Sequence, residues 1–144
     1  MQLDQTDWQI IRILTEQHKT NSDIARQLKL SEGAVRQRIK KLTENDALRV
    51  RALRNPNVLD NQQLAYVMIG VREARLLDCK AQEIAHLKNV LAVSIISGEY
   101  DLLAEILVGS NRGLVEFLTK DLASIDGITK TESLIVLKSY NKFI

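Results

Sequence analysis

Apolar residues near the start of the chain recur with the period of an α-helix. Ile10, Ile13 and Leu14 are spaced at i, i+3 and i+4, which predicts a short amphipathic helix over residues 4–17. A second apolar group follows Asn21, a residue type that caps helices well, and predicts a second helix that starts there. Only a few polar residues separate the two predicted helices.

A third predicted helix covers residues 32–45, with Ser31 expected as its N-cap. Val35, Ile39 and Leu42 fall within a narrow arc of its helical wheel, so we expect them to face a core. Three short helices with tight connections are the outline of a helix-turn-helix.

From about residue 48 the pattern changes to runs of β-branched and aliphatic residues, which predict strands. Two segments with helical spacing, residues 78–88 and 111–122, interrupt these runs. Apart from a short strand at 48–53, the order is strand, helix, strand, strand, helix, strand. That order predicts an α+β domain of the ferredoxin-like βαββαβ type, with four antiparallel strands and two helices on one face. The predicted strands of this domain are Leu64–Val71, Val90–Ser97, Leu102–Val108 and Ile125–Leu137.

The only proline marks a boundary between these two patterns. Pro56 lies in a polar stretch, Arg54 to Asn57, that is typical of a linker. We therefore expect a helical domain over residues 1–54, a linker over 55–60 and the ferredoxin-like domain over 61–144.

The net charge of +2 conceals a difference between the two predicted domains. Residues 1–54 carry eleven Lys and Arg against seven Asp and Glu, a net of +4, whereas residues 55–144 carry nine against eleven, a net of −2. The excess is concentrated in residues 36–54, which hold seven basic and two acidic side chains. A local excess on an otherwise balanced chain is typical of a surface that binds a polyanion.

The polar face of the third predicted helix fits DNA recognition. Gly33 would let the backbone approach a duplex closely, and Gln37 can hydrogen-bond an adenine edge in the major groove. Lys40 and Lys41 would reach phosphates, as would the arginines that follow the helix. Arg38 falls at the core boundary, so its guanidinium is expected to find either a phosphate or an acidic neighbour.

A basic helix face can also be simply solvated. Here the short preceding helix, the small residues at the start of the third helix and the run of bases together favour DNA binding. Residues at the two helix starts could add phosphate contacts, although capping explains them equally well. The predicted DNA-contacting residues are Asn21, Ser31, Gly33, Arg36, Gln37, Arg38, Lys40, Lys41, Arg49 and Arg51.

The tight Gly98-Glu-Tyr-Asp101 turn joins the two middle strands and has two interpretations. As a plain hairpin turn, Gly98 supplies a positive φ and Asp101 caps local amides. As a binding turn, Asp101 offers a carboxylate to an α-ammonium group, and backbone amides near Gly98 and Glu99 can donate to an α-carboxylate. The hydroxyls of Thr131 and Ser133 on the last strand are weaker candidates for the same site.

Sequence signals of an enzyme are lacking. The sequence contains no GxxxxGK[ST] or GxGxxG loop, and His18 and His86 lie far apart without a second ligand pair. Glu99 and Asp101 have no nucleophile or oxyanion donors to work with. We therefore expect no enzymatic activity, no metal and no other cofactor.

The sequence also predicts a location. Its single cysteine excludes an internal disulfide and fits a reducing compartment. No apolar stretch approaches the roughly 20 residues of a transmembrane helix, and residues 1–7 are acidic where a signal peptide is basic. We expect a cytoplasmic protein with no membrane partner.

Two sets of motifs follow one another along nearly the whole chain. In the first part they are Leu3-Asp-Gln-Thr-Asp7, Ile10-Ile-Arg-Ile-Leu14, Asp23-Ile-Ala25, Leu30-Ser31 and Val35-Arg-Gln-Arg-Ile39 with Leu42. In the second part they are Ser97-Gly-Glu-Tyr-Asp-Leu-Leu103, Gly127-Ile and Leu134-Ile-Val-Leu137. The first set resembles the N-terminal signature of the Lrp/AsnC (leucine-responsive/asparagine-responsive) transcription regulators, and the second resembles the glycine-x-tyrosine-aspartate turn and last strand of that family.

The resemblance implies a winged helix-turn-helix followed by a ferredoxin-like effector domain that dimerises and commonly assembles into octamers. It implies amino acids as effectors and places ligands near the turn of residues 98–101. The expected function is a sequence-specific transcriptional regulator that binds double-stranded DNA and is controlled by a small molecule, an amino acid. The predicted effector-binding residues are Ser97, Gly98, Glu99, Tyr100, Asp101, Thr131 and Ser133.

Two other functions remain open on the sequence alone. One is an architectural protein that compacts DNA with little response to an effector. The other is a small-molecule-binding enzyme subunit built on the ferredoxin-like half.

Overall fold

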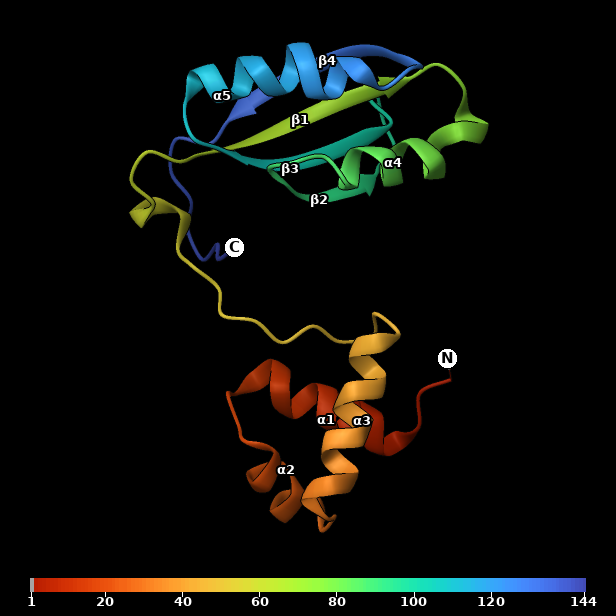
Figure 1. Cartoon of the computed structure of the whole chain (residues 1–144), viewed down its shortest axis with the longest axis vertical. Helices are drawn as coiled ribbons and strands as arrows, with labels where there is room; N and C mark the ends of the chain where they lie inside the picture. The colour runs from red at the N-terminus through yellow and green to blue at the C-terminus, as the bar shows by residue number, and fades with distance from the viewer. Residues whose placement is uncertain (1) are drawn as a thin grey trace. The chain divides into compact units, whose positions relative to one another are not determined.

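The computed structural model describes residues 2–144 and divides them into two compact units (Figure 1). The first, the helical unit, runs to Ala52, and the second, the α+β unit, begins at Leu53. Each unit has its own buried core.

Three helices form the helical unit, and each begins at a side-chain cap. Asp4, Thr20 and Ser31 each accept a hydrogen bond from the backbone N–H of the third residue of their helix. The prediction of Asn21 as an N-cap is wrong, because Thr20 caps the helix one residue earlier. The Thr20 backbone N–H in turn donates a hydrogen bond to the Asp23 carboxylate. The helices are α1 (Gln5–Glu16), α2 (Asn21–Leu28) and α3 (Glu32–Glu44).

The core of the helical unit confirms the predicted apolar faces. Ile10 and Ile24 are fully buried, as are Val35 and Leu42 on the predicted stripe of α3, and Ile39 is half-buried beside them. The chain changes direction between α2 and α3 at Lys29, which ends α2 in the left-handed conformation with a φ of 55°. A helix-turn-helix results.

The short strand expected at residues 48–53 is absent. The segment has no regular secondary structure, and the side chains of Val50 and Leu53 are 57% and 51% exposed. A strand needs a neighbouring strand to take its backbone hydrogen bonds, and no strand within residues 2–144 pairs with this segment. Its apolar pattern alone therefore predicted the wrong element.

The α+β unit has the predicted βαββαβ order. Its sheet is antiparallel throughout, with strand order β2-β3-β1-β4. The second helix lengthens through a π turn over Phe117–Asp121 and a 3-10 turn over Leu122–Ser124. The elements are β1 (Gln63–Val71), α4 (Leu77–Ala85), β2 (Val90–Ile95), β3 (Leu102–Val108), α5 (Asn111–Glu116) and β4 (Ile128–Ile135).

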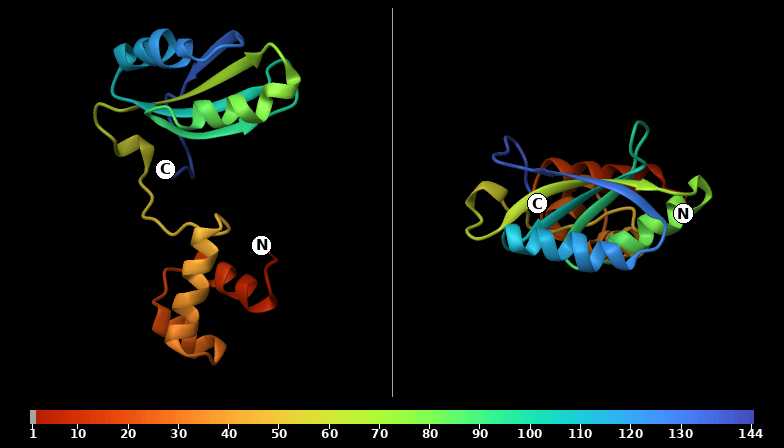
Figure 2. Two further views of the ribbon diagram at one scale, coloured as in Figure 1. Left: turned by 45° about the vertical axis from the view of Figure 1, so that its right-hand side comes forward. Right: turned by 90° about the horizontal axis from the view of Figure 1, so that it is seen from above.

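Both helices cover the same face of the sheet (Figures 1 and 2). Along β3 every second residue, from Leu102 to Val108, is buried under them, against Ile84 of α4 and Phe117. The intervening residues lie on the other face, which neither α4 nor α5 covers and which we call the open face.

The C-terminal segment after β4 returns to the start of the α+β unit. Arg54 and Ile144 exchange backbone hydrogen bonds in both directions, at 2.7 and 2.9 Å. Lys142 forms an ion pair with Glu105, which lies on the open face of β3. The connecting segment itself contains a short 3-10 turn, Pro56–Val58.

Within residues 2–144, no helix combines the length and apolar character needed to cross a membrane. The same residues hold no cluster of three or more His, Cys, Asp and Glu side chains placed to bind a metal ion.

Candidate nucleic-acid interface and effector turn

The outer face of α3 carries five of the ten residues predicted to contact DNA. Gly33, Arg36, Gln37, Lys40 and Lys41 are all exposed, on the side of the helix away from its buried stripe. A Cβ added to Gly33 would meet no atom within 4 Å, so the first turn of α3 is open to a close approach by a partner. The geometry fits a helix entering a major groove.

Several basic side chains on α3 and in the segment after it are held only by weak surface pairs. Lys40 lies 3.7 Å from Glu44, Arg49 lies 3.6 Å from Asp46, and Arg36 pairs with Glu32 one turn earlier. Exposed pairs of this kind contribute about 0–1 kcal/mol each, so a phosphate can replace the carboxylate at little cost. Lys41 and Arg51 form no ion pair with any residue from 2 to 144.

Arg38 differs from the other bases of α3. Its Nη1 atom lies 2.7 Å from Asp4 Oδ2 and 2.7 Å from Asp7 Oδ1, and its side chain is only 34% exposed. These hydrogen bonds raise the pKa of Arg38 above its ordinary value. Of the two destinations expected for its guanidinium, the structure shows the acidic neighbours.

The two residues predicted at helix starts have different roles. Ser31 Oγ accepts a hydrogen bond from the Ala34 N–H at 3.1 Å and is exposed. Asn21 is the first residue of α2 and is half-buried. Both lie at helix N-termini, where backbone N–H groups point outward and favour an anion.

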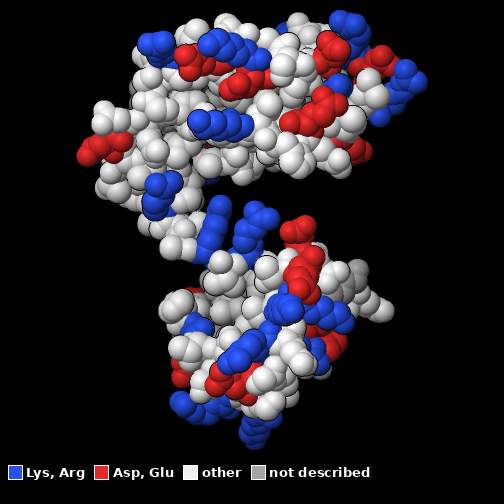
Figure 3. Space-filling model, in the orientation of Figure 1, with Lys and Arg blue, Asp and Glu red and all other residues white. Residues whose placement is uncertain are grey.

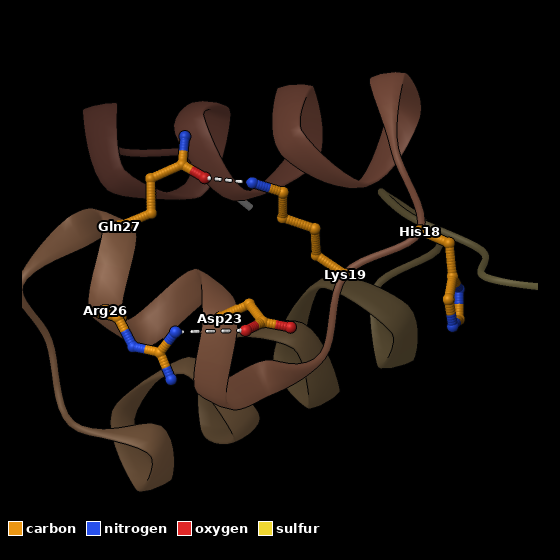
Figure 4. Close-up of a pocket in the computed structure, with 5 residues that line it drawn as sticks. All are labelled: His18, Lys19, Asp23, Arg26 and Gln27. Carbon is orange, nitrogen blue, oxygen red and sulfur yellow. Dashed lines mark hydrogen bonds and ion pairs between the residues drawn. The ribbon is translucent and has the colours of Figure 1, made fainter.

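Sequence reasoning missed a shallow hollow beside α2, with a volume of about 510 Å³ (Figure 4). Two of its cationic side chains already have partners: Lys19 Nζ donates to Gln27 Oε1 at 3.0 Å, and Arg26 lies 3.7 Å from Asp23. Basic and acidic side chains are interspersed on the face of the helical unit drawn in Figure 3. The hollow is therefore a weaker candidate for DNA contact than the outer face of α3.

The predicted effector turn is tied to the neighbouring strand. Asp101 Oδ2 accepts a hydrogen bond from the Val71 N–H at 2.7 Å, and the Asp101 N–H donates to the Ile69 carbonyl at 3.0 Å. Val71 lies at an irregularity in the pairing of β1 with β4, which leaves its N–H in need of an acceptor. Gly98 has a φ of +143°, as the turn interpretation expects.

Side chains of β4 complete the surroundings of this turn. The Tyr100 hydroxyl donates to Glu132 Oε2 at 2.8 Å, and this bond raises the pKa of Tyr100. Lys130 Nζ lies 3.1 Å from Glu99 Oε1 and 4.4 Å from the centre of the Tyr100 ring. A Cβ on Gly70 would approach Lys130 Cγ to 2.9 Å, so the glycine leaves the room that the lysine stem occupies.

The register of β4 divides the predicted effector residues between two faces. Thr131 pairs with Ile69 and Ser133 with Val67, so both hydroxyls lie on the helix-covered side of the sheet. Lys130 and Glu132 alternate with them and share the open face, where they meet the turn. Their role was not predicted, although strand alternation is the signal that separates the two pairs.

Comparison with protein-family models decides the family. A model described as the Lrp/AsnC ligand binding domain matches residues 64–143, and one described as a winged helix-turn-helix DNA-binding domain matches residues 3–49. The chain belongs to the Lrp/AsnC family. The predicted family and fold class are confirmed, and the protein is a DNA-binding transcriptional regulator with a ligand-binding domain.

Individual relatives in the Lrp/AsnC family align over nearly the whole chain. An uncharacterized HTH-type transcriptional regulator of Pyrococcus furiosus is 34% identical over 136 residues, covering 93% of this chain and 91% of that protein. The crystal structure of the leucine response regulatory protein of Mycobacterium tuberculosis has a TM-score of 0.78 at 23% identity and covers 97% of this chain and 96% of that one. A Neisseria meningitidis regulator solved in complex with L-Met has a TM-score of 0.69 at 23% identity, covering 98% and 94%.

Proposed function

We propose that the outer face of α3 reads the DNA sequence and that the basic residues around it bind phosphates. The observation that carries this proposal is the set of exposed, weakly paired side chains on α3 opposite a fully buried stripe. Gln37 is assigned to a base edge, with Gly33 allowing the close approach. Arg36, Lys40, Lys41, Arg49 and Arg51 are assigned to phosphates, and Asn21 and Ser31 to phosphate contact at the two helix starts.

The effector in this proposal is an amino acid bound at the turn of residues 97–101. An amino acid carries one ammonium and one carboxylate, and the turn gathers both signs of charge in Glu99, Lys130 and Glu132. In the structure Lys130 pairs with Glu99, and Glu132 accepts from the Tyr100 hydroxyl. The ammonium and carboxylate of an amino acid can replace one partner in each of these pairs. The L-Met complex of the Neisseria meningitidis regulator supports the ligand class. The assigned residues are Ser97, Gly98, Glu99, Tyr100 and Asp101, with Lys130 and Glu132 added. Thr131 and Ser133 are left out of the assignment, because their side chains lie on the helix-covered face of the sheet.

The proposed partner in assembly is a second copy of the chain. The open face of the sheet presents a half-buried apolar surface that includes Met68, Leu103 and Leu107, with Leu134 beside them. A two-fold dimer through such a face would present two reading helices to a palindromic site, and octamers would follow from further contacts. A regulator of this kind acts on the chromosome in the cytoplasm and catalyses no reaction.

Substitution of both lysines tests the DNA proposal. In Lys40→Ala/Lys41→Ala we expect weaker DNA binding and a log–log salt slope that falls by about 1 for each phosphate contact removed. The matched control is Lys88→Ala/Lys120→Ala, which removes the same charge from exposed positions of the α+β unit. Equal affinity and slope in the two double variants would contradict the assignment of α3 as the reading helix.

A titration of amino acids tests effector control. We expect one or more amino acids to change both the size of the assembly, measured by light scattering, and its DNA affinity, because the two are linked. An architectural protein that only compacts DNA would show neither change.

A further inference from the structure

We propose that Arg38 is a positioning residue for DNA recognition, which acts through Asp4 and Asp7 and not by touching DNA. The inference rests on the proposed function, since it concerns how the α3 reading face is held. Arg38 lies on α3 between the reading face and the core, whereas both aspartates belong to the start of α1.

The contact joins two helices through groups that are themselves fixed. Asp4 and Asp7 form the capping box of α1: the Asp7 N–H donates to Asp4 Oδ1 at 2.8 Å, and the Asp4 N–H donates to Asp7 Oδ2 at 3.1 Å. Each aspartate keeps its other carboxylate oxygen for Arg38. The guanidinium is therefore held by two carboxylates whose orientation the start of α1 determines.

Burial separates this contact from the other ion pairs of α3. The Asp7 side chain is 14% exposed and that of Arg38 is 34% exposed, whereas the pairs made by Arg36 and Lys40 have both partners between 49% and 73% exposed. Exchanging the aspartates for a DNA phosphate would leave the mostly buried Asp7 carboxylate without its cation. Such an exchange is costly, so Arg38 is expected to keep its partners when DNA binds.

The position of the contact links it to recognition. A hollow of about 380 Å³ is lined by the three residues of the contact together with Gln2, Ala34, Gln37 and Lys41. Gln37 and Lys41 are one residue before and three residues after Arg38 on the reading helix. A change in the angle at which α3 packs against α1 would therefore move the base-reading Gln37 and the phosphate-binding Lys41 together. Base readout needs hydrogen-bond geometry, while phosphate attraction tolerates displacement, so sequence discrimination is the property that depends on this contact.

The test compares Arg38→Gln with Arg36→Gln in the full chain. Two duplexes serve as probes: one selected by the wild-type protein from a random pool, and one of equal length with scrambled sequence. For Arg38→Gln we expect the ratio of the two affinities to fall about tenfold, with affinity for the scrambled duplex and the salt slope unchanged. For Arg36→Gln, which lies on the exposed face, we expect the salt slope to fall by about 1.

A second comparison separates action through the aspartates from direct contact. In the Asp4→Asn/Asp7→Asn background, Arg38→Gln should cause no further loss of the affinity ratio, because its partners are already gone. A lower salt slope in Arg38→Gln, or an equal loss in both backgrounds, would show a direct phosphate contact and would overturn the inference.

Binding is measured at a temperature where circular dichroism shows every variant fully folded, so that lost stability does not imitate lost recognition. A lower melting temperature with an unchanged affinity ratio would show a purely structural contact and would also overturn the inference. The two proposals fail separately. If Lys40→Ala/Lys41→Ala and Arg36→Gln leave DNA binding intact, the reading face itself is misplaced, whereas a failure confined to Arg38→Gln leaves that face standing.

Discussion

The side-chain amide of Asn57 bonds the backbone of Ser139 at both of its polar ends. Asn57 Nδ2 donates to the Ser139 carbonyl at 2.6 Å, and Asn57 Oδ1 accepts from the Ser139 N–H at 3.0 Å. An amide side chain that bonds both the N–H and the carbonyl of one residue has the hydrogen-bond pattern of a paired residue in an antiparallel sheet. The C-terminal segment is therefore attached to the chain just before β1 by a specific contact.

Replacing Asn57 by alanine should release this segment. Two hydrogen bonds of ordinary net strength correspond to about 1–2 kcal/mol, reduced by the exposure of the site. We expect faster amide hydrogen exchange in residues 136–144 and unchanged exchange in the strands. Asn111→Ala, at an exposed helical position, is the matched control, and equal exchange in both variants would contradict the attachment.

Replacing Asp101 by alanine should destabilise the α+β unit even without an effector. The change leaves the Val71 N–H without its acceptor, which costs about 1–3 kcal/mol. Glu99→Ala, at an exposed position in the same turn, should stay within about 0.5 kcal/mol of wild type. Denaturant midpoints of the ligand-free protein measure both effects. An Asp101→Ala variant as stable as wild type would contradict this structural role of the carboxylate.

Local periodicity was sufficient to predict most of the fold. The stripe of Val35, Ile39 and Leu42 and the bounds of β3 follow from patterns that each segment carries alone. Whether residues 48–53 form a strand could not be predicted from their own apolar pattern, because a strand forms only if another strand takes its backbone hydrogen bonds.

The candidate sites were less predictable, because they depend on contacts between distant segments. Arg38 had two chemically suitable destinations, and only the packing of α1 on α3 decides between them. On β4, strand alternation separates Thr131 from Lys130, but only the register with β1 shows which of the two lies on the face of the turn.

Replacing Phe117 by alanine should destabilise the α+β unit strongly. The ring is fully buried among the core residues under α5, and its removal costs about 3–5 kcal/mol. Val115→Ala changes an apolar residue that is 57% exposed on the same helix and should have an effect within about 0.5 kcal/mol. Calorimetry measures the unfolding of the α+β unit. The single tryptophan, Trp8 in α1, reports on the helical unit, and we expect its transition to be unchanged.

Acid should weaken the helical unit through Asp4. The Asp7 N–H, followed by the Arg38 guanidinium, lowers the pKa of Asp4 below its ordinary value of 3.8. A lowered pKa in the folded state contributes stability that is present above 3.8 and is lost as the pH falls through the folded pKa. The stability difference between wild type and Asp4→Ala should therefore be constant near neutral pH and shrink in acid. A difference that grows in acid would contradict this contact.

The backbone pairing of Arg54 with Ile144 brings the two ends of the α+β unit into contact. A short peptide joining these ends would make the unit circular without disturbing its sheet, and new N- and C-termini could then be placed in an exposed loop. The helical unit could thus be joined to the sheet at a different strand while the arrangement of the strands in the sheet stays the same. Permuted versions of this domain should fold, and they would allow a DNA-reading module to be attached at a different edge of the sheet.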